Sequence, residues 1–309
     1  MITLISNFVP PNPPFENSTT RIAILKGYDL STFKPIYCQS ARIGFVSPKV
    51  EKELQDFQNV FKIYPDKIDI CQGLKSYAEI TEKIEPVLKQ LKEKDIFESL
   101  RGWSNEKFDI RQSMGMAPLF AIERAACNMF GFLQYYINVT AYVVNDDESI
   151  SVWLQRRALH KSRDPGKLDS FVAGGIASGD SIRETAIKES EEEANLPKYL
   201  SDQLKPTGCI SYFYQTDDLE LVAVTEYVFD LEVPKSFVPT NNDGQVEGFV
   251  LVPIPELMEK ICTPDVKPAA AQILLDFLIR RGFITFESDP NLPTVIEMLH
   301  APLHQFYNS

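Results

Sequence analysis

The stretch GGIASGDSIRETAIKESEEEANL, residues 174–196, decides the fold and carries the chemistry. It opens on two adjacent glycines, which permit a backbone turn that other residues resist. Ser181 is followed three positions later by Glu184, the spacing of a capping box in which each residue caps the other's backbone amide. We therefore expect a helix that begins near Ile182, directly after a glycine turn.

Three glutamates of this helix, Glu189, Glu192 and Glu193, are spaced i, i+3 and i+4, which places their carboxylates on one patch. Like charges at this spacing repel by a few tenths of a kcal/mol per pair. They also lie toward the helix C-terminus, where the helix dipole disfavours anions. A hard divalent cation such as Mg²⁺ would relieve both costs and would bring substrate phosphates with it. The alternative is an acidic, solvated helix without a ligand.

The charge of the whole chain narrows the class of partner. Its 309 residues include 43 acidic and 31 basic side chains, for a net charge of −12. Between Asp180 and Glu193, six acidic residues stand against two basic ones, so this segment holds about a third of the excess. Nucleic acid and anionic membranes would repel such a chain, and we expect neither as a partner.

The cysteines and the start of the chain bear on the compartment. The five cysteines are far apart and never form a C-x-x-C pair, which is typical of free thiols in a reducing compartment. The opening MITLISNFVPPNPPF has no basic segment and meets prolines too early for a signal peptide. We expect a cytoplasmic protein.

Hydrophobic periodicity predicts the remaining elements. Strands are expected at 135–144, 150–158, 208–215 and 220–234, and helices at 50–57, 77–100, 118–130, 269–282 and about 292–300, with a loop over 1–20. The composition changes near residue 130, from helical segments rich in Lys and Glu to short strands. We predict two domains, 1–130 and 131–309, of which the second is an α/β layered domain.

The stretch that begins at Gly174 resembles a known sequence motif, the Nudix box. The pattern of that motif is G-x5-E-x7-R-E-U-x-E-E-x-G-U, with U apolar. Glu189, Glu192 and Glu193 match the metal-binding glutamates of that pattern. The chain departs from it at four positions, with Asp180 for Glu, Lys188 for Arg, Ser190 for an apolar residue and Asn195 for Gly. Lys188 keeps the charge without the bidentate fork, and Asn tolerates the left-handed conformation of the replaced glycine.

The similarity extends over nearly the whole chain. WLQRRALHKSRDPGKLDSFVAGG, AAAQILLDFLIRRGFI and, toward the N-terminus, LRGWSNEKFDI resemble the eukaryotic Nudix subfamily related to thiamin pyrophosphokinase. This resemblance implies an α/β/α sandwich with a mixed β-sheet, preceded by a smaller α+β domain. It also implies a Mg²⁺-dependent diphosphatase, with Mn²⁺ as a substitute, that converts thiamin diphosphate, or its oxidised or damaged analogues such as oxothiamin and oxythiamin diphosphate, to the monophosphate. The protein would be a monomer or a homodimer.

Basic residues upstream of the box are candidates for binding the diphosphate. The cluster contains Arg156, Arg157, His160, Lys161 and Arg163, and we favour Arg157 and Lys161. A solvated loop that neutralises nearby acids is the alternative. Gly174 and Gly175 would let the substrate approach the backbone.

Other residues complete the candidate site. Glu192, Glu193 and Glu247 are the candidate catalytic carboxylates, with Glu247 as a fourth metal ligand or general base and Asp243 as its alternative. Asp180 and Lys188 would be structural residues of the box. Four aromatics could stack on a planar heterocycle or belong to the core: Trp103, Phe108, Tyr212 and Phe213.

Two other functions stay open. One is a Nudix pyrophosphatase that cleaves a nucleoside-diphosphate derivative such as a nucleotide sugar. The other is a non-catalytic diphosphate-binding regulatory protein, for which the departures at Lys188, Ser190 and Asn195 are the support.

Overall fold

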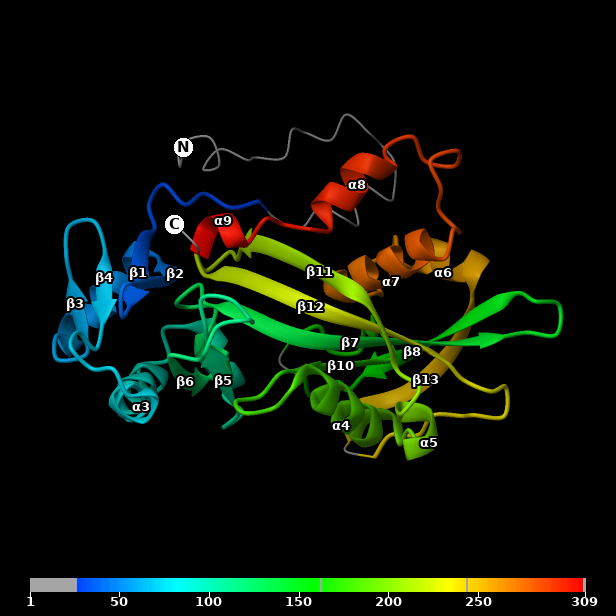
Figure 1. Cartoon of the computed structure of the whole chain (residues 1–309), viewed down its shortest axis with the longest axis horizontal. Coiled ribbons are helices and arrows are strands. Elements are labelled where there is room, and N and C mark those ends of the chain that lie inside the picture. The colour runs from blue at the N-terminus through cyan, green and yellow to red at the C-terminus, as the bar shows by residue number, and fades with distance from the viewer. Residues whose placement is uncertain (1–26, 162, 243, 308–309) are drawn as a thin grey trace.

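The computed structural model describes residues 27–161, 163–242 and 244–307. Its larger part is built on a seven-stranded mixed sheet in the order β11-β12-β7-β8-β13, with β10 beside β7 and β9 beside β8 (Figure 1). The strands are β7 (Leu133–Val144), β8 (Ile150–Arg157), β9 (Leu168–Asp169), β10 (Val172–Gly175), β11 (Lys205–Gln215), β12 (Leu221–Glu232) and β13 (Val246–Pro253).

The strand predictions for this part are confirmed. β7 is rich in β-branched and aromatic residues, which suit a pleated and largely buried strand. It forms a hairpin with β8 across the acidic turn, where Tyr142 pairs with Val152. β7 also runs parallel to β12, where Leu133 pairs with Ala223. The sheet is therefore mixed.

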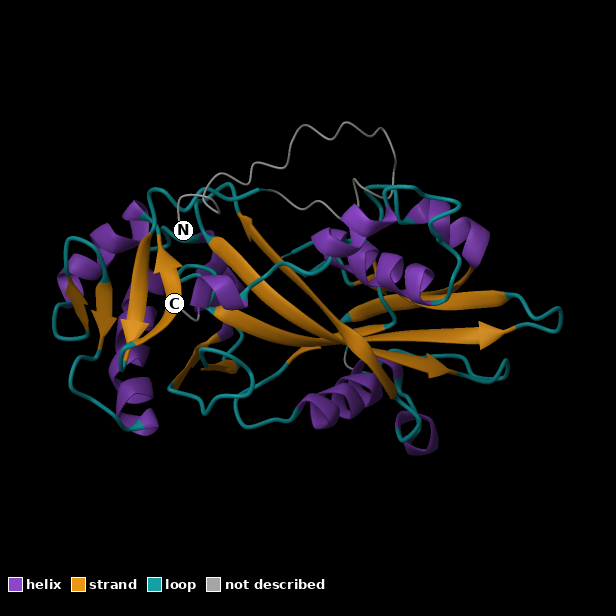
Figure 2. Cartoon of the chain, turned by 45° about the horizontal axis from the view of Figure 1, so that its top comes forward, coloured by secondary structure: helices purple, strands orange, loops and turns teal. Residues whose placement is uncertain are grey.

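Helices cover both faces of this sheet (Figures 1 and 2). On one side lie α4 (Ile182–Ala194) and α5 (Lys198–Ser201), and on the other α6 (Ile254–Lys260), α7 (Pro268–Arg280) and α8 (Leu292–Met298). Ala186 and Ala194 of α4 are fully buried, as are Leu274 and Phe277 of α7. These two apolar layers make an α/β/α sandwich, as expected.

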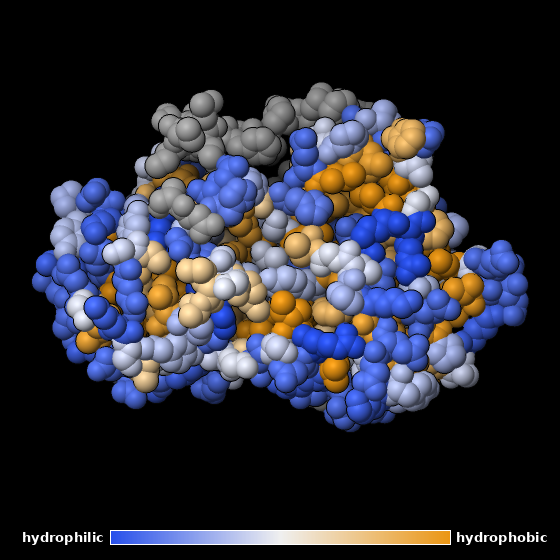
Figure 3. Space-filling model, in the orientation of Figure 1, coloured by the Kyte–Doolittle hydropathy of each residue, from blue (hydrophilic) through white to orange (hydrophobic). Residues whose placement is uncertain are grey.

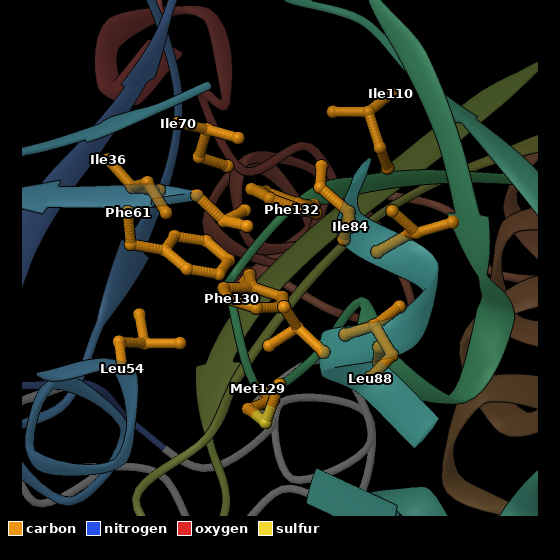
Figure 4. Packing of buried hydrophobic residues seen from close by; sticks show 14 of the residues in the cluster. Ile36, Leu54, Phe61, Ile70, Ile84, Leu88, Ile110, Met129, Phe130 and Phe132 are labelled. Atoms are coloured by element: carbon orange, nitrogen blue, oxygen red, sulfur yellow. The ribbon is translucent and has the colours of Figure 1, made fainter. Parts of the chain in front are cut away.

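The N-terminal part is a smaller α+β unit around a four-stranded sheet in the order β2-β1-β4-β3. It contains β1 (Lys34–Cys38), β2 (Ala41–Val46), α2 (Pro48–Leu54), η2 (Gln55–Phe57), β3 (Phe61–Ile63), β4 (Ile68–Ile70), α3 (Tyr77–Glu93), η3 (Glu98–Gly102), β5 (Lys107–Ile110), β6 (Phe120–Glu123) and η4 (Arg124–Ala126). Its core includes the stacked rings of Phe61 and Phe130, 5.8 Å apart, and of Phe130 and Phe132, 5.0 Å apart (Figure 4).

Two helix predictions in this part need correction. The helix expected over 118–130 is wrong, because the segment forms β6 and the short η4. β6 pairs with β5 and buries Phe120 and Ile122, so cross-strand pairing overrides the apolar spacing that suggested a helix. The helix expected over 77–100 ends at Glu93 and is followed by the left-handed Asp95, with φ of 52°. The loop expected over 1–20 lies outside the described residues.

The C-terminal residues return to the N-terminal part. Tyr307, in α9 (His304–Tyr307), is fully buried, and its hydroxyl donates a 2.7 Å hydrogen bond to the carbonyl of Gly131. Gln112 donates to the Tyr307 carbonyl at 2.8 Å. These contacts tie the end of the chain to the junction between its two parts.

The surface carries some exposed apolar side chains. Figure 3 shows apolar residues in the region of α8, where Ile296 is 41% exposed. In the described part of the chain, no helix combines the length and the apolar character needed to span a membrane.

Candidate active site

The box helix, α4, begins and ends as its sequence predicts. The Glu184 amide donates to Ser181 Oγ at 3.3 Å, and the Ser181 amide donates to Glu184 Oε2 at 3.2 Å, so both halves of the capping box are present. Asn195 ends the helix in the left-handed conformation, with φ of 50°. The Asn-for-Gly departure therefore preserves the helix end.

Glu193 reaches from α4 into the sheet. It is only 6% exposed, and its Oε2 accepts hydrogen bonds of 3.2 Å from the Ala173 amide on β10 and from Gln155 Nε2 on β8. Burial raises the pKa of Glu193 to about 8, and the negative charges of Glu189 and Asp169 act in the same direction. A carboxyl group in this environment is stabilised by a bound proton or by a cation.

Glu189 lies against Gly174. The backbone turn expected at Gly174 and Gly175 is wrong, because both glycines end strand β10, where they pair with Ile137 and Tyr136 of β7, and neither has a positive φ. A Cβ atom placed on Gly174 would lie 2.3 Å from both Cγ and Cδ of Glu189, so the glutamate side chain would have to move. The first glycine of the box therefore packs closely against a candidate metal ligand. Glu192, on the same helix, is partly exposed.

The fit to a divalent cation rests on the chemistry of these donors. Within the described residues, no three or more His, Cys, Asp or Glu side chains are already arranged as a metal cluster. Glu193, however, is a buried carboxyl whose pKa is raised further by the charge of Glu189. Carboxylate oxygens are the ligands that Mg²⁺ prefers, so Glu193 and Glu189 are candidates to hold a divalent cation.

Arg157, a candidate for binding the diphosphate, is engaged by the protein itself. Its Nη1 donates to Asp169 Oδ2 at 2.9 Å, and its other nitrogens donate to the carbonyls of Arg163 and Asp164. Lys267 Nζ also donates to Asp169 Oδ2 at 2.9 Å. Asp169 is fully buried, and although burial acts to raise its pKa, Lys267 and Arg157 hold that pKa below its usual value.

Sequence reasoning missed Asp169 and Lys267. They lie 98 residues apart, and neither belongs to a recognisable motif. The bridge between Leu168 and Val266 brings them together.

Lys161 lies in the loop after β8, and Glu247 lies at the start of the neighbouring strand β13. The Lys161 ammonium donates to Gln245 Oε1, and its charge acts to lower the pKa of Glu193. Glu247 is exposed, and its Oε1 accepts a 3.3 Å hydrogen bond from the Leu159 amide. It stands at the irregularity in the pairing of β13 with β8, between Val246 and Gly248. Asp243 lies outside the described residues.

Asp180 and Lys188 of the box face a carboxylate of the N-terminal part. Burial raises the pKa of Glu106, the positive charges of Arg124 and Lys188 oppose that rise, and the charge of Asp180 adds to it. Glu106 Oε2 lies 3.1 Å from Arg124 Nε. Glu106 was not a candidate in the sequence, because nothing nearby in the chain marks it.

The candidate aromatics divide between the site and the core. Phe108 is 3% exposed, and a Cβ on Gly175 would lie 2.3 Å from its Cζ, so Phe108 packs directly on Gly175. Phe213 is a core residue stacked on Phe306 at 4.7 Å. Tyr212 donates to the buried Glu226 at 2.7 Å, and Trp103 packs against the N-terminal core.

A capped helix that carries carboxylates, after a strand that ends in two glycines and on a mixed sheet between two helical layers, defines a hydrolase of the Nudix type. The NUDIX domain family matches residues 134–275, and a domain of unknown function, DUF4743, matches residues 15–134. The chain is 35% identical to Nudix hydrolase 24, chloroplastic, of Arabidopsis thaliana over 84% of its own length and 70% of that protein. The chain belongs to the Nudix hydrolase family, whose members hydrolyse pyrophosphate bonds.

Two further likenesses were found. An uncharacterized protein of Saccharomyces cerevisiae is 30% identical, over 85% of this chain and 81% of the yeast protein. Among solved structures, one from Deinococcus radiodurans has a TM-score of 0.41 and 22% identity, covering 57% of this chain and 98% of that one.

Proposed function

We propose that this Nudix hydrolase is a Mg²⁺-dependent diphosphatase of thiamin diphosphate-like substrates, above all of oxidised or damaged analogues. The observation that carries the catalytic part is the buried Glu193 beside Glu189, with a pKa of about 8. The resemblance of both parts of the chain to the thiamin pyrophosphokinase-related subfamily supports the substrate class.

Each candidate residue has a role in this proposal. Glu189, Glu192 and Glu193 hold the cation, which when bound neutralises charge on the phosphoryl group and lowers the pKa of a bound water. Glu247 accepts a proton from the attacking water. The water oxygen forms a bond to the terminal phosphorus, the bond from that phosphorus to the bridging oxygen breaks, and the organic monophosphate and inorganic phosphate leave.

The basic and glycine residues position the substrate. Lys161, close enough to influence Glu193, binds the diphosphate, and Arg157 holds Arg163 and Asp164 in place while its Nη1 contacts Asp169. Gly174 and Gly175 keep the end of β10 free of side chains. Asp180 and Lys188 keep the box in register with the N-terminal part.

The test is phosphate release from a panel of diphosphates, with Mg²⁺, with Mn²⁺ and with EDTA. The panel holds thiamin, oxothiamin and oxythiamin diphosphates, a nucleotide sugar and ADP-ribose. Release that requires the cation and is fastest with a thiamin analogue supports the proposal. Turnover only of the nucleotide sugar or ADP-ribose would replace it with a nucleoside-diphosphate pyrophosphatase. Binding without turnover of any compound would indicate a regulatory protein.

The proposal includes a cytoplasmic protein, as a monomer or homodimer. The spacing of the five cysteines, which never form a C-x-x-C pair, is typical of a reducing compartment and supports this part of the proposal. Fractionation of cells with an antibody to the chain, and light scattering of the purified protein, test these two points.

A further inference from the structure

The turn between the box glycines and the box helix is held by the N-terminal part of the chain. The Ser178 amide donates a 2.8 Å hydrogen bond to the carbonyl of Lys107 on β5. The Ser178 hydroxyl donates to Asp109 Oδ1, also at 2.8 Å. One residue of the turn is thereby joined to β5 through both its backbone and its side chain.

A third element completes this contact. Tyr77, at the start of α3, donates to Asp109 Oδ1 at 2.7 Å, and its hydroxyl lies 2.8 Å from Ser178 Oγ. Arg111 Nη2 pairs with Asp109 Oδ2 at 2.7 Å. The Asp109 side chain is only 10% exposed, so both of its oxygens are used in a largely dry environment. Hydrogen bonds of this kind, with a charged acceptor, are stronger than neutral ones.

Apolar packing reinforces the polar contact. Phe108, the residue between Lys107 and Asp109, lies against Gly175 and meets the Tyr136 ring at 5.6 Å. The same strand therefore presses on the second box glycine with one face and binds Ser178 with the other. The turn is therefore held on two sides by residues that lie outside the segment 134–275, which matches the NUDIX domain family.

The turn follows directly on a strand that contacts a candidate metal ligand. Gly174, in the strand β10 that leads into the turn, packs closely on the Glu189 side chain. A displacement of the turn that carries the end of β10 with it would therefore shift the Glu189 carboxylate relative to Glu193. Because positioning errors near 1 Å can cost about a hundredfold in rate, a small displacement would be visible in turnover.

We propose that Tyr77 and Asp109 are positioning residues of the active site, which hold the turn over residues 176–180 through Ser178. The N-terminal part is then a component of the catalytic machinery. Its contribution to turnover rests on the proposed function, whereas its contribution to the turn's order does not.

The test compares Tyr77→Phe, Asp109→Asn and Ser178→Ala with the control Tyr64→Phe. Tyr64 is another phenol of the N-terminal part, whose hydroxyl accepts a hydrogen bond from Gln72. Hydrogen exchange of the amides over 176–180 should speed up at least fivefold in the first three variants and stay unchanged in the control. Exchange elsewhere in the N-terminal part should stay unchanged in all four, which shows that the fold is intact.

Two further measurements connect the turn to the site. The dissociation constant for Mn²⁺, followed by electron paramagnetic resonance, should rise at least threefold in Tyr77→Phe and Asp109→Asn. With a diphosphate that the wild type cleaves, kcat should fall about tenfold and KM should change less than twofold. Wild-type exchange at 176–180 in all three variants would overturn the proposal. Fast exchange in a protein that cleaves no diphosphate would instead overturn the proposed function and leave the positioning role standing.

Discussion

Gly174 and Glu189 are packed so closely that a Cβ on the glycine would lie 2.3 Å from two carbons of the glutamate side chain. Gly174→Ala should therefore force the Glu189 side chain or the end of β10 aside. We expect a loss of about 1–3 kcal/mol of unfolding free energy, as for overpacking in a core, together with weaker Mn²⁺ binding. Urea denaturation and a Mn²⁺ titration measure the two effects.

The matched control is Gly115→Ala. Gly115 lies in an exposed loop, and nothing lies within 4 Å of the position its Cβ would take. This variant should keep wild-type stability and Mn²⁺ affinity. Equal behaviour of the two alanine variants would contradict the role assigned to the close contact.

The buried Glu193 predicts how the metal-free protein responds to pH. Its pKa is raised from 4.5 to about 8 in the folded state, so the folded protein binds a proton that the unfolded chain has released. This contribution to stability is complete below pH 4.5 and is lost as the pH rises through about 8. In EDTA, the unfolding free energy of the wild type should fall between pH 5 and 8.5 more steeply than that of Glu193→Gln.

Urea denaturation at several pH values measures this difference. The glutamine cannot ionise, so it retains the neutral form at every pH, and the two curves should diverge above about pH 5. Parallel curves for wild type and variant would show that Glu193 is not buried as the structure has it.

Cation binding should raise the melting temperature more at high pH than at low pH. Mg²⁺ competes with the proton on Glu193, whose pKa is about 8. Saturating Mg²⁺ should thus stabilise the wild type more at pH 8.5 than at pH 6, and this gain should vanish in Glu193→Gln and Glu189→Gln. Differential scanning fluorimetry with and without Mg²⁺ measures it.

Glu191→Gln is the control for the cation effect. Glu191 belongs to the same turn of α4, is exposed and lies outside the metal positions of the box pattern. It should keep the full stabilisation by Mg²⁺. A loss equal to that of the Glu193 variant would mean that general acidity of the helix, rather than a defined site, attracts the cation.

The sequence predicts the box and its helix because their determinants are local. The capping box depends on Ser181 and Glu184, three positions apart, and the helix end depends on Asn195 alone. Strands β7, β8, β11 and β12 were found for the same reason, since β-branched and aromatic runs mark them directly, whereas the short strands β9 and β10 were not predicted. The helix expected over 118–130 failed because its apolar spacing serves β6, and only the partner strand β5 reveals this.

The surroundings of the site could not be predicted, because they depend on distant pairs. Lys267 and Asp169 are 98 residues apart, and Tyr77 and Ser178 are 101 apart. Neither pair has a motif or a spacing that sequence reasoning can use. The chain topology brings both pairs together. The Leu168–Val266 bridge does so for the first pair, and the contact of β5 with Ser178 does so for the second.

The ion pair of Lys267 with Asp169 and that of Arg156 with Asp265 should differ sharply in their contribution to stability. Lys267 pairs with the fully buried Asp169, whereas Arg156 pairs with Asp265, whose side chain is 49% exposed. Lys267→Met leaves a buried carboxylate with Arg157 as its remaining cation, so we expect a loss of about 3 kcal/mol. Arg156→Met removes a screened surface pair, so we expect a loss of at most about 1 kcal/mol.

Denaturation of both variants at pH 7 checks this ranking, and Lys267→Met combined with Asp169→Asn sharpens it. The asparagine removes the uncompensated charge, so the double variant should recover part of the stability lost in Lys267→Met. Recovery is expected because the cost of breaking a buried pair lies mainly in the charge left behind. A double variant less stable than Lys267→Met would show that packing of the lysine stem, rather than the charge on Asp169, makes Lys267 important to the sheet that Glu193 contacts.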